Sequence, residues 1–148
     1  MEAVVVIGVM GIILLLLHSA FSEFLTRSNV SEVQTNVVGL LRDARARTLA
    51  SESAAIYGVH FDMLASRVVL FKGAAYSAGD AANEPYQLPP AMAINSVNLG
   101  GSVDIVFQAL TGYASASGTV VFQSKRESSH RATTTILGTG AVCAGPLC

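Results

Sequence analysis

The fold of this chain is decided by the stretch EAVVVIGVMGIILLLL, residues 2–17, in which Glu2 precedes fifteen consecutive apolar residues. His18 and Ser19 interrupt the run, which then resumes as far as Phe21. A helix that crosses the hydrocarbon core of a bilayer needs about 20 apolar residues. The stretch therefore predicts an apolar N-terminal helix that lies in a membrane or is enclosed by other helices.

Two ordinary explanations of such a run fit poorly. A cleavable secretory signal has a basic segment ahead of its apolar core, whereas here an acid follows Met1 and the first basic residue is Arg27. A plain single-span anchor usually carries Lys or Arg at its cytoplasmic end, and this chain has none on that side of the run. Both explanations stay open but are disfavoured.

A third explanation accounts for the acid. A carboxylate beside lipid is costly and usually has a partner. In a helical filament, the N-terminal ammonium of a neighbouring subunit can be the partner of Glu2. Small residues let helices approach closely, so Gly8 and Gly11 are expected at such helix–helix contacts.

The first thirteen residues, MEAVVVIGVMGII, resemble the N-terminal motif of type IV pilins and type II secretion pseudopilins. That motif has a single Glu followed by an apolar helix containing a Gly, and Glu2 and Gly11 take those positions. The resemblance implies a pilin, major or minor, that forms a homopolymer or joins other pilins in a filament. It also implies a prokaryotic source, a prepilin peptidase and pilus assembly machinery as partners, and a single-pass inner-membrane state before an extracellular or periplasmic filament.

After the apolar run, an apolar stripe recurs at steps of three and four residues, which is typical of an amphipathic helix. Its members are Val30, Val33, Val37, Leu41, Ala44 and Thr48. We expect one helix from residue 2 to about residue 52, although Asn29 and Glu32 form a possible capping box that would start a second helix. The first half, residues 1–27, would be the membrane or filament-core segment, and residues 28–148 the head domain.

An arginine cluster lies near the end of this helix. Residues 40–52 resemble the corresponding stretch of the GspH/FimT branch of pseudopilins and minor pilins. Arg42, Arg45 and Arg47 are candidates for contacts with an acidic partner. A solvated face neutralised by Asp43 and Glu52 is the preferred interpretation.

Beyond residue 53 the apolar period changes to two, which indicates strands. Strands are expected at 55–61, 67–72, 91–99, 103–109, 118–124 and 131–137, and a long surface loop at 73–90, which holds three of the four prolines. A helix followed by strands predicts an α+β fold with an antiparallel sheet. Residues 103–123 resemble the GspH/FimT head.

Cys143 and Cys148 are the only cysteines. A closely spaced pair near the end of a chain fits a small disulfide loop in an oxidising compartment. Two free thiols are the alternative.

The sequence carries no hydrolase, zinc-protease or phosphate-loop motif, and no Cys/His set with metal-ligand spacing. We therefore expect no enzyme, no metal and no cofactor. His60 lies two residues before Asp62, but acid–base work there is disfavoured. Calcium binding by Asp62, Asp80 and Glu84 is also disfavoured because their spacing is not that of an EF-hand.

One basic segment remains as a possible binding site. Lys125, Arg126 and Arg131 lie in an expected hairpin turn, where they are candidates for contact with DNA phosphates or another partner. Glu127 weakens the field, and the segment has no aromatic residue to stack a base. Two alternatives to a pilin are thus kept. One is a type II secretion pseudopilin, and the other is a membrane-anchored DNA-binding module.

Overall fold

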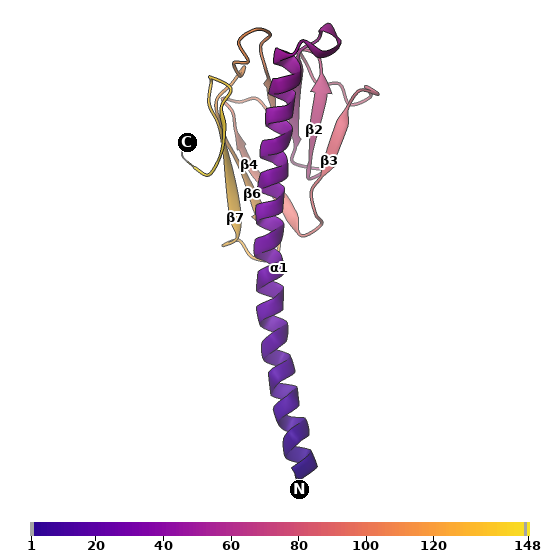
Figure 1. The fold of residues 1–148 in the computed structure, drawn as a ribbon, viewed down its shortest axis with the longest axis vertical. Coiled ribbons are helices and arrows are strands. Elements are labelled where there is room, and N and C mark those ends of the chain that lie inside the picture. Colours follow the sequence, from indigo (N-terminus) through magenta and orange to yellow (C-terminus); the bar gives the residue numbers. More distant parts are fainter. Residues whose placement is uncertain (1, 147) are drawn as a thin grey trace.

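One long helix carries a β-rich head at its C-terminal end (Figure 1). A computed structural model describes residues 2–146 and 148, with the side chains of residues 2–5 and 14–26 left out of the description. Helix α1 spans Glu2–Leu49, which at 1.5 Å per residue is about 72 Å. Its N-terminal part projects from the head, and its C-terminal part lies along the head (Figure 1).

The C-terminal half of α1 docks through the apolar stripe that the sequence predicts. Val33, Val37, Leu41, Ala44 and Thr48 are all fully buried. Their spacing of three and four residues places them on one face of the helix. The prediction of a continuous helix is confirmed, and no second helix starts near residue 29.

The helix ends three residues before the expected position. The buried Thr48 hydroxyl donates to the carbonyl of Ala44 and accepts the backbone N–H of Tyr57, both at 2.9 Å. It thereby joins the last turn of α1 to the first strand. A short 3-10 turn, Glu52–Ala54, links the two elements, and Ser51 and Ser53 there adopt left-handed backbone conformations.

The head contains two antiparallel four-stranded sheets. The first has the order β3-β2-β1-β5 and the second the order β4-β6-β7-β8. The strands are β1 Tyr57–Asp62, β2 Arg67–Lys72, β3 Glu84–Gln87, β4 Met92–Asn98, β5 Asp104–Val106, β6 Gly118–Ser124, β7 Arg131–Ile136 and β8 Val142–Ala144.

Side chains from both sheets and α1 form one apolar core. Phe61 of the first sheet and Phe122 of the second belong to the same buried cluster as Val37 and Leu41 of the helix. Burying each such side chain stabilises the fold by about 1.5–3 kcal/mol. The predicted α+β architecture, a helix on antiparallel strands, is confirmed, with two sheets instead of one.

Two strands were absent from the sequence prediction. β3 lies inside the expected surface loop 73–90, and β8 lies beyond the last expected strand. Pro85 is tolerated because β3 is an edge strand, where a residue without an N–H breaks no ladder on its outer side. The expected strand at 103–109 is shorter than predicted, because β5 ends at Val106 and the chain turns towards β6.

Candidate assembly surface

The projecting part of α1 exposes large apolar side chains. Those described are Val6, Ile7, Val9, Met10, Ile12 and Ile13, whose exposed fractions lie between 49% and 71%. Within the part of the chain whose placement is described, no helix meets the length and apolarity needed to cross a membrane. At about 100° per residue, these side chains cover more than half of the helix circumference, and Gly8 and Gly11 lie on the remaining face.

The two glycines expected at helix contacts lie within this segment. A Cβ atom built on Gly8 or Gly11 would meet nothing within 4 Å among the described atoms. Space for a close approach is therefore present on both. The backbone of Glu2 begins α1, but its side chain lies outside the described residues.

The arginines near the end of α1 attach the head to the helix. Arg45 Nε donates to the carbonyl of Gly112 at 3.0 Å, and its Nη2 donates to that of Thr139 at 3.4 Å. Arg42 Nη2 donates to the carbonyl of Val142 at 3.2 Å. These bonds reach two loops and the β8 strand, so Arg45 and the exposed Arg42 both attach the head to the helix.

The third arginine joins α1 to the first sheet. Arg47 pairs with Glu84 of β3 and with Asp43, the latter at 2.8 Å. Its second carboxylate partner is therefore Glu84 and not, as the sequence suggested, Glu52. The hydrogen bonds to Glu84 and then to Asp43 raise the pKa of Arg47 further above its usual value. The three side chains are partly exposed, and an exposed ion pair contributes about 1 kcal/mol or less.

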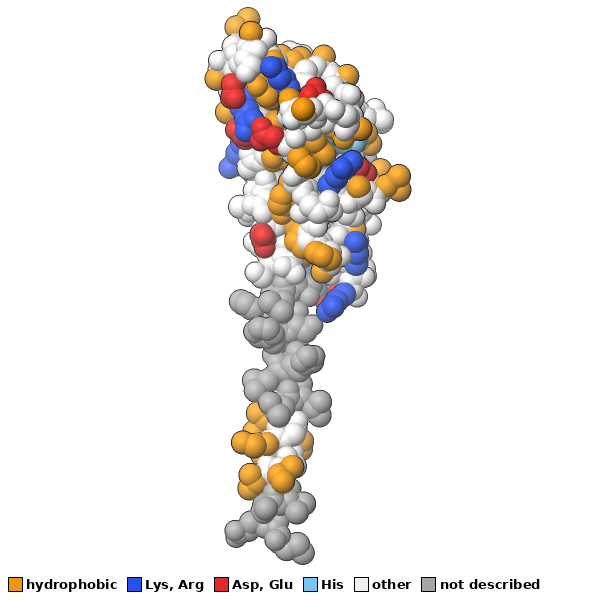
Figure 2. Space-filling view, turned by 90° about the vertical axis from the view of Figure 1, so that its right-hand side faces the viewer, with side chains coloured by type: hydrophobic (Ala, Val, Ile, Leu, Met, Phe, Trp, Pro, Cys, Tyr) orange, Lys and Arg blue, Asp and Glu red, His pale blue; other side chains and the backbone are white. Residues whose placement is uncertain are grey.

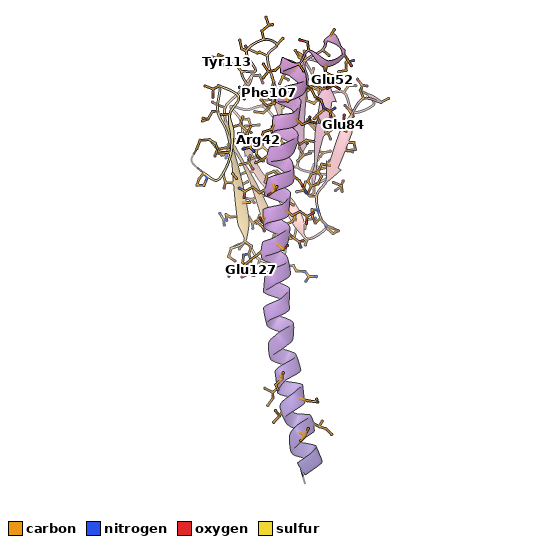
Figure 3. The ribbon with its side chains drawn as sticks, viewed as in Figure 1. Arg42, Glu52, Glu84, Phe107, Tyr113 and Glu127 are labelled. Atoms are coloured by element: carbon orange, nitrogen blue, oxygen red, sulfur yellow. A yellow bond between two sulfur atoms is a disulfide. The ribbon has the colours of Figure 1, made fainter. Side chains whose placement is uncertain are left out.

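The basic hairpin segment lies at the end of the head from which α1 projects. Figure 3 shows Glu127 there, beside the helix and opposite the end that carries Glu52 and Tyr113. Lys125 and Arg126 are exposed, and Arg131 donates through Nε and Nη2 to the carbonyl of Ser128 at 3.3 and 3.2 Å. The sequence alone gave no sign of which end of the head this hairpin occupies.

The two cysteines are joined in the structure. Cys143 of β8 and Cys148 form a disulfide with a Cα–Cα distance of 5.4 Å. Arg42 donates a hydrogen bond to the carbonyl of Val142, just before the disulfide loop. The C-terminal segment is therefore held both by the disulfide and by α1.

His60 forms a cluster that the sequence did not indicate. Its Nδ1 pairs with Asp104 of β5 at 2.5 Å, and its ring stacks on Tyr76 with centroids 3.9 Å apart. Tyr76 also meets the ring of Phe71 edge-on at 5.8 Å. The segment between β2 and β3 thereby covers the outer face of the first sheet.

The acidic residues considered for calcium do not meet. Asp62 accepts the backbone N–H of Ala65 and pairs with Arg67, whereas Asp80 accepts the backbone N–H of Ala82. Glu84 is engaged with Arg47. Among the described residues, no group of three or more His, Cys, Asp or Glu side chains is arranged to hold a metal ion.

The comparisons with known proteins rest on structure alone. No protein-family model and no curated protein matches the sequence. Two solved structures of the minor pseudopilin EpsH from the Type 2 Secretion System of Vibrio cholerae are similar to the chain. One has a TM-score of 0.59 and 12% identity over 78% of this chain and 95% of the other.

The second structure agrees with the first. Its TM-score is 0.60, with 13% identity over 80% of this chain and 94% of the other. Identities this low bear on the fold only. The chain therefore has a pilin-like α+β fold similar to that of the minor pseudopilin EpsH.

Proposed function

We propose that this chain is a structural subunit of a type IV pilus-like filament, assembled through its N-terminal helix. The observation that carries the proposal is the division of α1 into two halves. One half packs an apolar face against the head, and the other projects with exposed apolar side chains over more than half of its circumference.

A helix that is apolar all round is stable only when it is surrounded. A single docking partner would cover one face and leave the others in water. Lipid before assembly, and copies of the same helix afterwards, both enclose the segment completely. Figure 2 shows apolar side chains on both edges of the described part of the projecting helix.

Glu2, Gly8 and Gly11 have specific roles in this proposal. Glu2 pairs with the N-terminal ammonium of a neighbouring subunit, which offsets the cost of placing a carboxylate in an apolar core. Gly8 and Gly11, on which a Cβ would meet no described atom, let neighbouring helices approach closely. The partners are then identical subunits or other pilins, the inner membrane, a prepilin peptidase and the assembly machinery.

A second candidate is a pseudopilin of a type II secretion system. The fold likeness to EpsH, named as a minor pseudopilin of such a system, favours it specifically. In that case the subunit forms part of a periplasmic filament and is present in few copies. The role of the helix is the same in both candidates.

Electron microscopy and mass spectrometry of the filaments sheared from source cells distinguish the candidates. A major pilin is abundant in thin sheared filaments. A minor pilin or pseudopilin is found in traces there and mainly in membranes. If the chain is absent from both the filaments and the membranes and is found only as a soluble protein, the proposal is wrong.

A further inference from the structure

Four of the nine basic residues lie at the base of the head, the end from which α1 projects. Arg27 of α1 lines a groove of about 390 Å³ together with residues 129–133 of the hairpin and β7. Gln34, two turns further along α1, donates to the carbonyl of Thr133 at 2.7 Å and fixes the level of β7 on the helix. Lys125 and Arg126 complete the set, which we name the basal cluster: Arg27, Lys125, Arg126 and Arg131.

The charges of the basal cluster are only partly compensated. Within the described part of the chain, no carboxylate forms an ion pair with Lys125, Arg126 or Arg131. Glu127 faces His130 at 3.2 Å and accepts the hydroxyl of Ser129. Glu32 of α1 is exposed nearby, and Glu23 precedes Arg27 by one helical turn in the sequence, so four fixed positive charges stand against three carboxylates in this part of the chain.

This excess is local. The whole chain has a net charge of −1, with nine basic and ten acidic residues. Figure 2 shows Lys and Arg side chains at the lower rim of the head, next to the point where α1 leaves it, and others higher on the head. A concentration of charge at one end indicates a partner at that end.

The length of the helix between the apolar run and the base identifies the partner. Phe21 ends the run, and Arg27 follows six residues later, about 9 Å along a helix that rises 1.5 Å per residue. The polar headgroup layer extends about 5–7 Å beyond the hydrocarbon on each side of a bilayer. When residues 3–21 lie in the hydrocarbon, the backbone of Arg27 lies about 2–4 Å beyond the headgroup layer, a gap that an extended Lys or Arg side chain can bridge to reach the lipid phosphates.

We propose that the basal cluster binds the phosphates of anionic phospholipids while the chain is anchored in the membrane. This inference rests on the proposed membrane-inserted state of the helix. Each Lys or Arg near an anionic membrane surface strengthens binding to that surface by about five-fold. The contact adds a second attachment beside the helix and holds the head against the membrane in one orientation before assembly.

Phosphates of DNA have the same chemistry, but the position of the cluster favours lipid. A membrane-anchored chain presents its base to the bilayer, where a nucleic acid has little room. The hairpin turn between Ser124 and Arg131 also contains no Phe, Tyr or Trp on which a base could stack. DNA binding thus becomes an outcome of the test and not part of the proposal.

The test uses tryptophan fluorescence of the full chain in vesicles. The chain has no tryptophan, so Ser128→Trp, at an exposed turn position, places a single reporter at the base. Vesicles of phosphatidylcholine, with or without about 30% phosphatidylglycerol to supply an anionic surface, carry a headgroup spin label that quenches a nearby indole. We expect stronger quenching with phosphatidylglycerol, and loss of the difference at about 1 M salt, where the Debye length is about 3 Å.

Two controls locate the effect. Tyr113→Trp places the reporter at the opposite end of the head (Figure 3) and should give weak quenching with either lipid. Lys125→Gln in the Ser128→Trp chain should lower the ratio of headgroup-bound to unbound heads about five-fold. Lys72→Gln, the same chemical change at an exposed end of β2 away from the base, should not shift it.

The outcomes separate this inference from the proposed function. If the chain does not insert into either vesicle, the membrane-inserted state fails and the inference falls with it. If it inserts but quenching is the same with both lipids, or Lys125→Gln behaves like Lys72→Gln, only the inference is overturned. A reporter that responds to added single-stranded DNA but not to phosphatidylglycerol also overturns it, in favour of DNA.

Discussion

Gly58 has no room for a side chain in the head. It lies in β1 opposite Phe71 of β2, on the face that Tyr76 covers. A Cβ there would be 2.5 Å from the ring of Phe71 and 2.7 Å from the backbone carbonyl of Ile105. A glycine at this position lets the ring of Phe71 lie against the strand.

Gly58→Ala is expected to destabilise the chain by about 1–3 kcal/mol, the usual cost of overpacking a filled site. Gly39→Ala is the matched control, since Gly39 is an exposed helical residue with nothing within 4 Å of its Cβ. Alanine there should stabilise α1 by up to about 1 kcal/mol. Chemical denaturation of the detergent-solubilised chain measures both, and equal effects of the two substitutions would contradict the packing described for Gly58.

His60 shows the limit of sequence reasoning at the scale of one residue. Its neighbour Asp62, two positions along β1, is the partner that the sequence offers. Asp62 is instead engaged by Ala65 and Arg67 in the turn, and His60 meets Asp104, 44 residues away. The pairing of β1 with β5 creates that contact, and no local pattern reports it.

At the scale of the element, the interface between α1 and the head depends on arginines that bind backbone carbonyls. Gly112 and Gly140 both have left-handed backbone conformations, and a Cβ on either would lie within 2.9 Å of Arg45 Nε. The guanidinium of Arg45 therefore fits between two loops from the second half of the chain. A stripe of apolar residues predicted where α1 docks, but nothing in the sequence marked these carbonyls.

Arg45→Lys is expected to cost about 1–3 kcal/mol, because a lysine cannot reproduce the planar fork that reaches Gly112 and Thr139. Arg42→Lys should cost less, since Arg42 is exposed and makes one bond, to Val142. Thermal unfolding of the two variants compares them directly. An Arg45→Lys chain as stable as Arg42→Lys would show that apolar packing alone holds the head on the helix.

The turn between β1 and β2 should make stability depend on pH in acid. The backbone N–H of Ala65, and then Arg67, hold the pKa of Asp62 below its usual value. A carboxyl whose pKa is lower in the folded state stabilises the fold above its unfolded pKa of about 3.9, and this contribution is lost as the pH falls through the folded value.

Asp62→Asn should therefore destabilise the chain by about 0.5–1.5 kcal/mol at neutral pH, because the charged acceptor is lost. The difference from the unsubstituted chain should shrink as the pH falls below about 4. Unfolding free energies measured at neutral and acid pH test this. A difference that stays constant or grows in acid would mean that the carboxylate is not what stabilises this turn.

The elements themselves could be predicted unevenly. The long run of apolar residues and the stripe after it indicated α1 almost to its end, because both signals extend over many turns. β3 was missed because its proline and polar residues resemble a loop, and pairing with the edge of β2 is what makes it a strand. β8 has only three residues between Gly140 and Gly145, too few for an alternating pattern.

On the scale of the whole molecule, the two ends of the head differ in character. The base carries the basal cluster beside the projecting helix, and the opposite end exposes Leu49, Leu110 and Tyr113. The order of helix and strands indicated the α+β architecture, but the sequence could not assign loops to ends. That assignment depends on the directions of β6 and β7 along α1, which only long-range packing fixes.

The central claim is that the chain enters a filament through its N-terminal helix, with Glu2 pairing to a neighbour. The most direct test is the amount of Glu2→Ala chain in sheared filaments, compared with Glu52→Ala, which removes a carboxylate from the far end of the head (Figure 3). Mass spectrometry of the filament and membrane fractions gives both amounts. We predict that Glu2→Ala stays in the membrane while Glu52→Ala enters filaments like the unsubstituted chain; Glu2→Ala found in filaments at the same level would contradict the account.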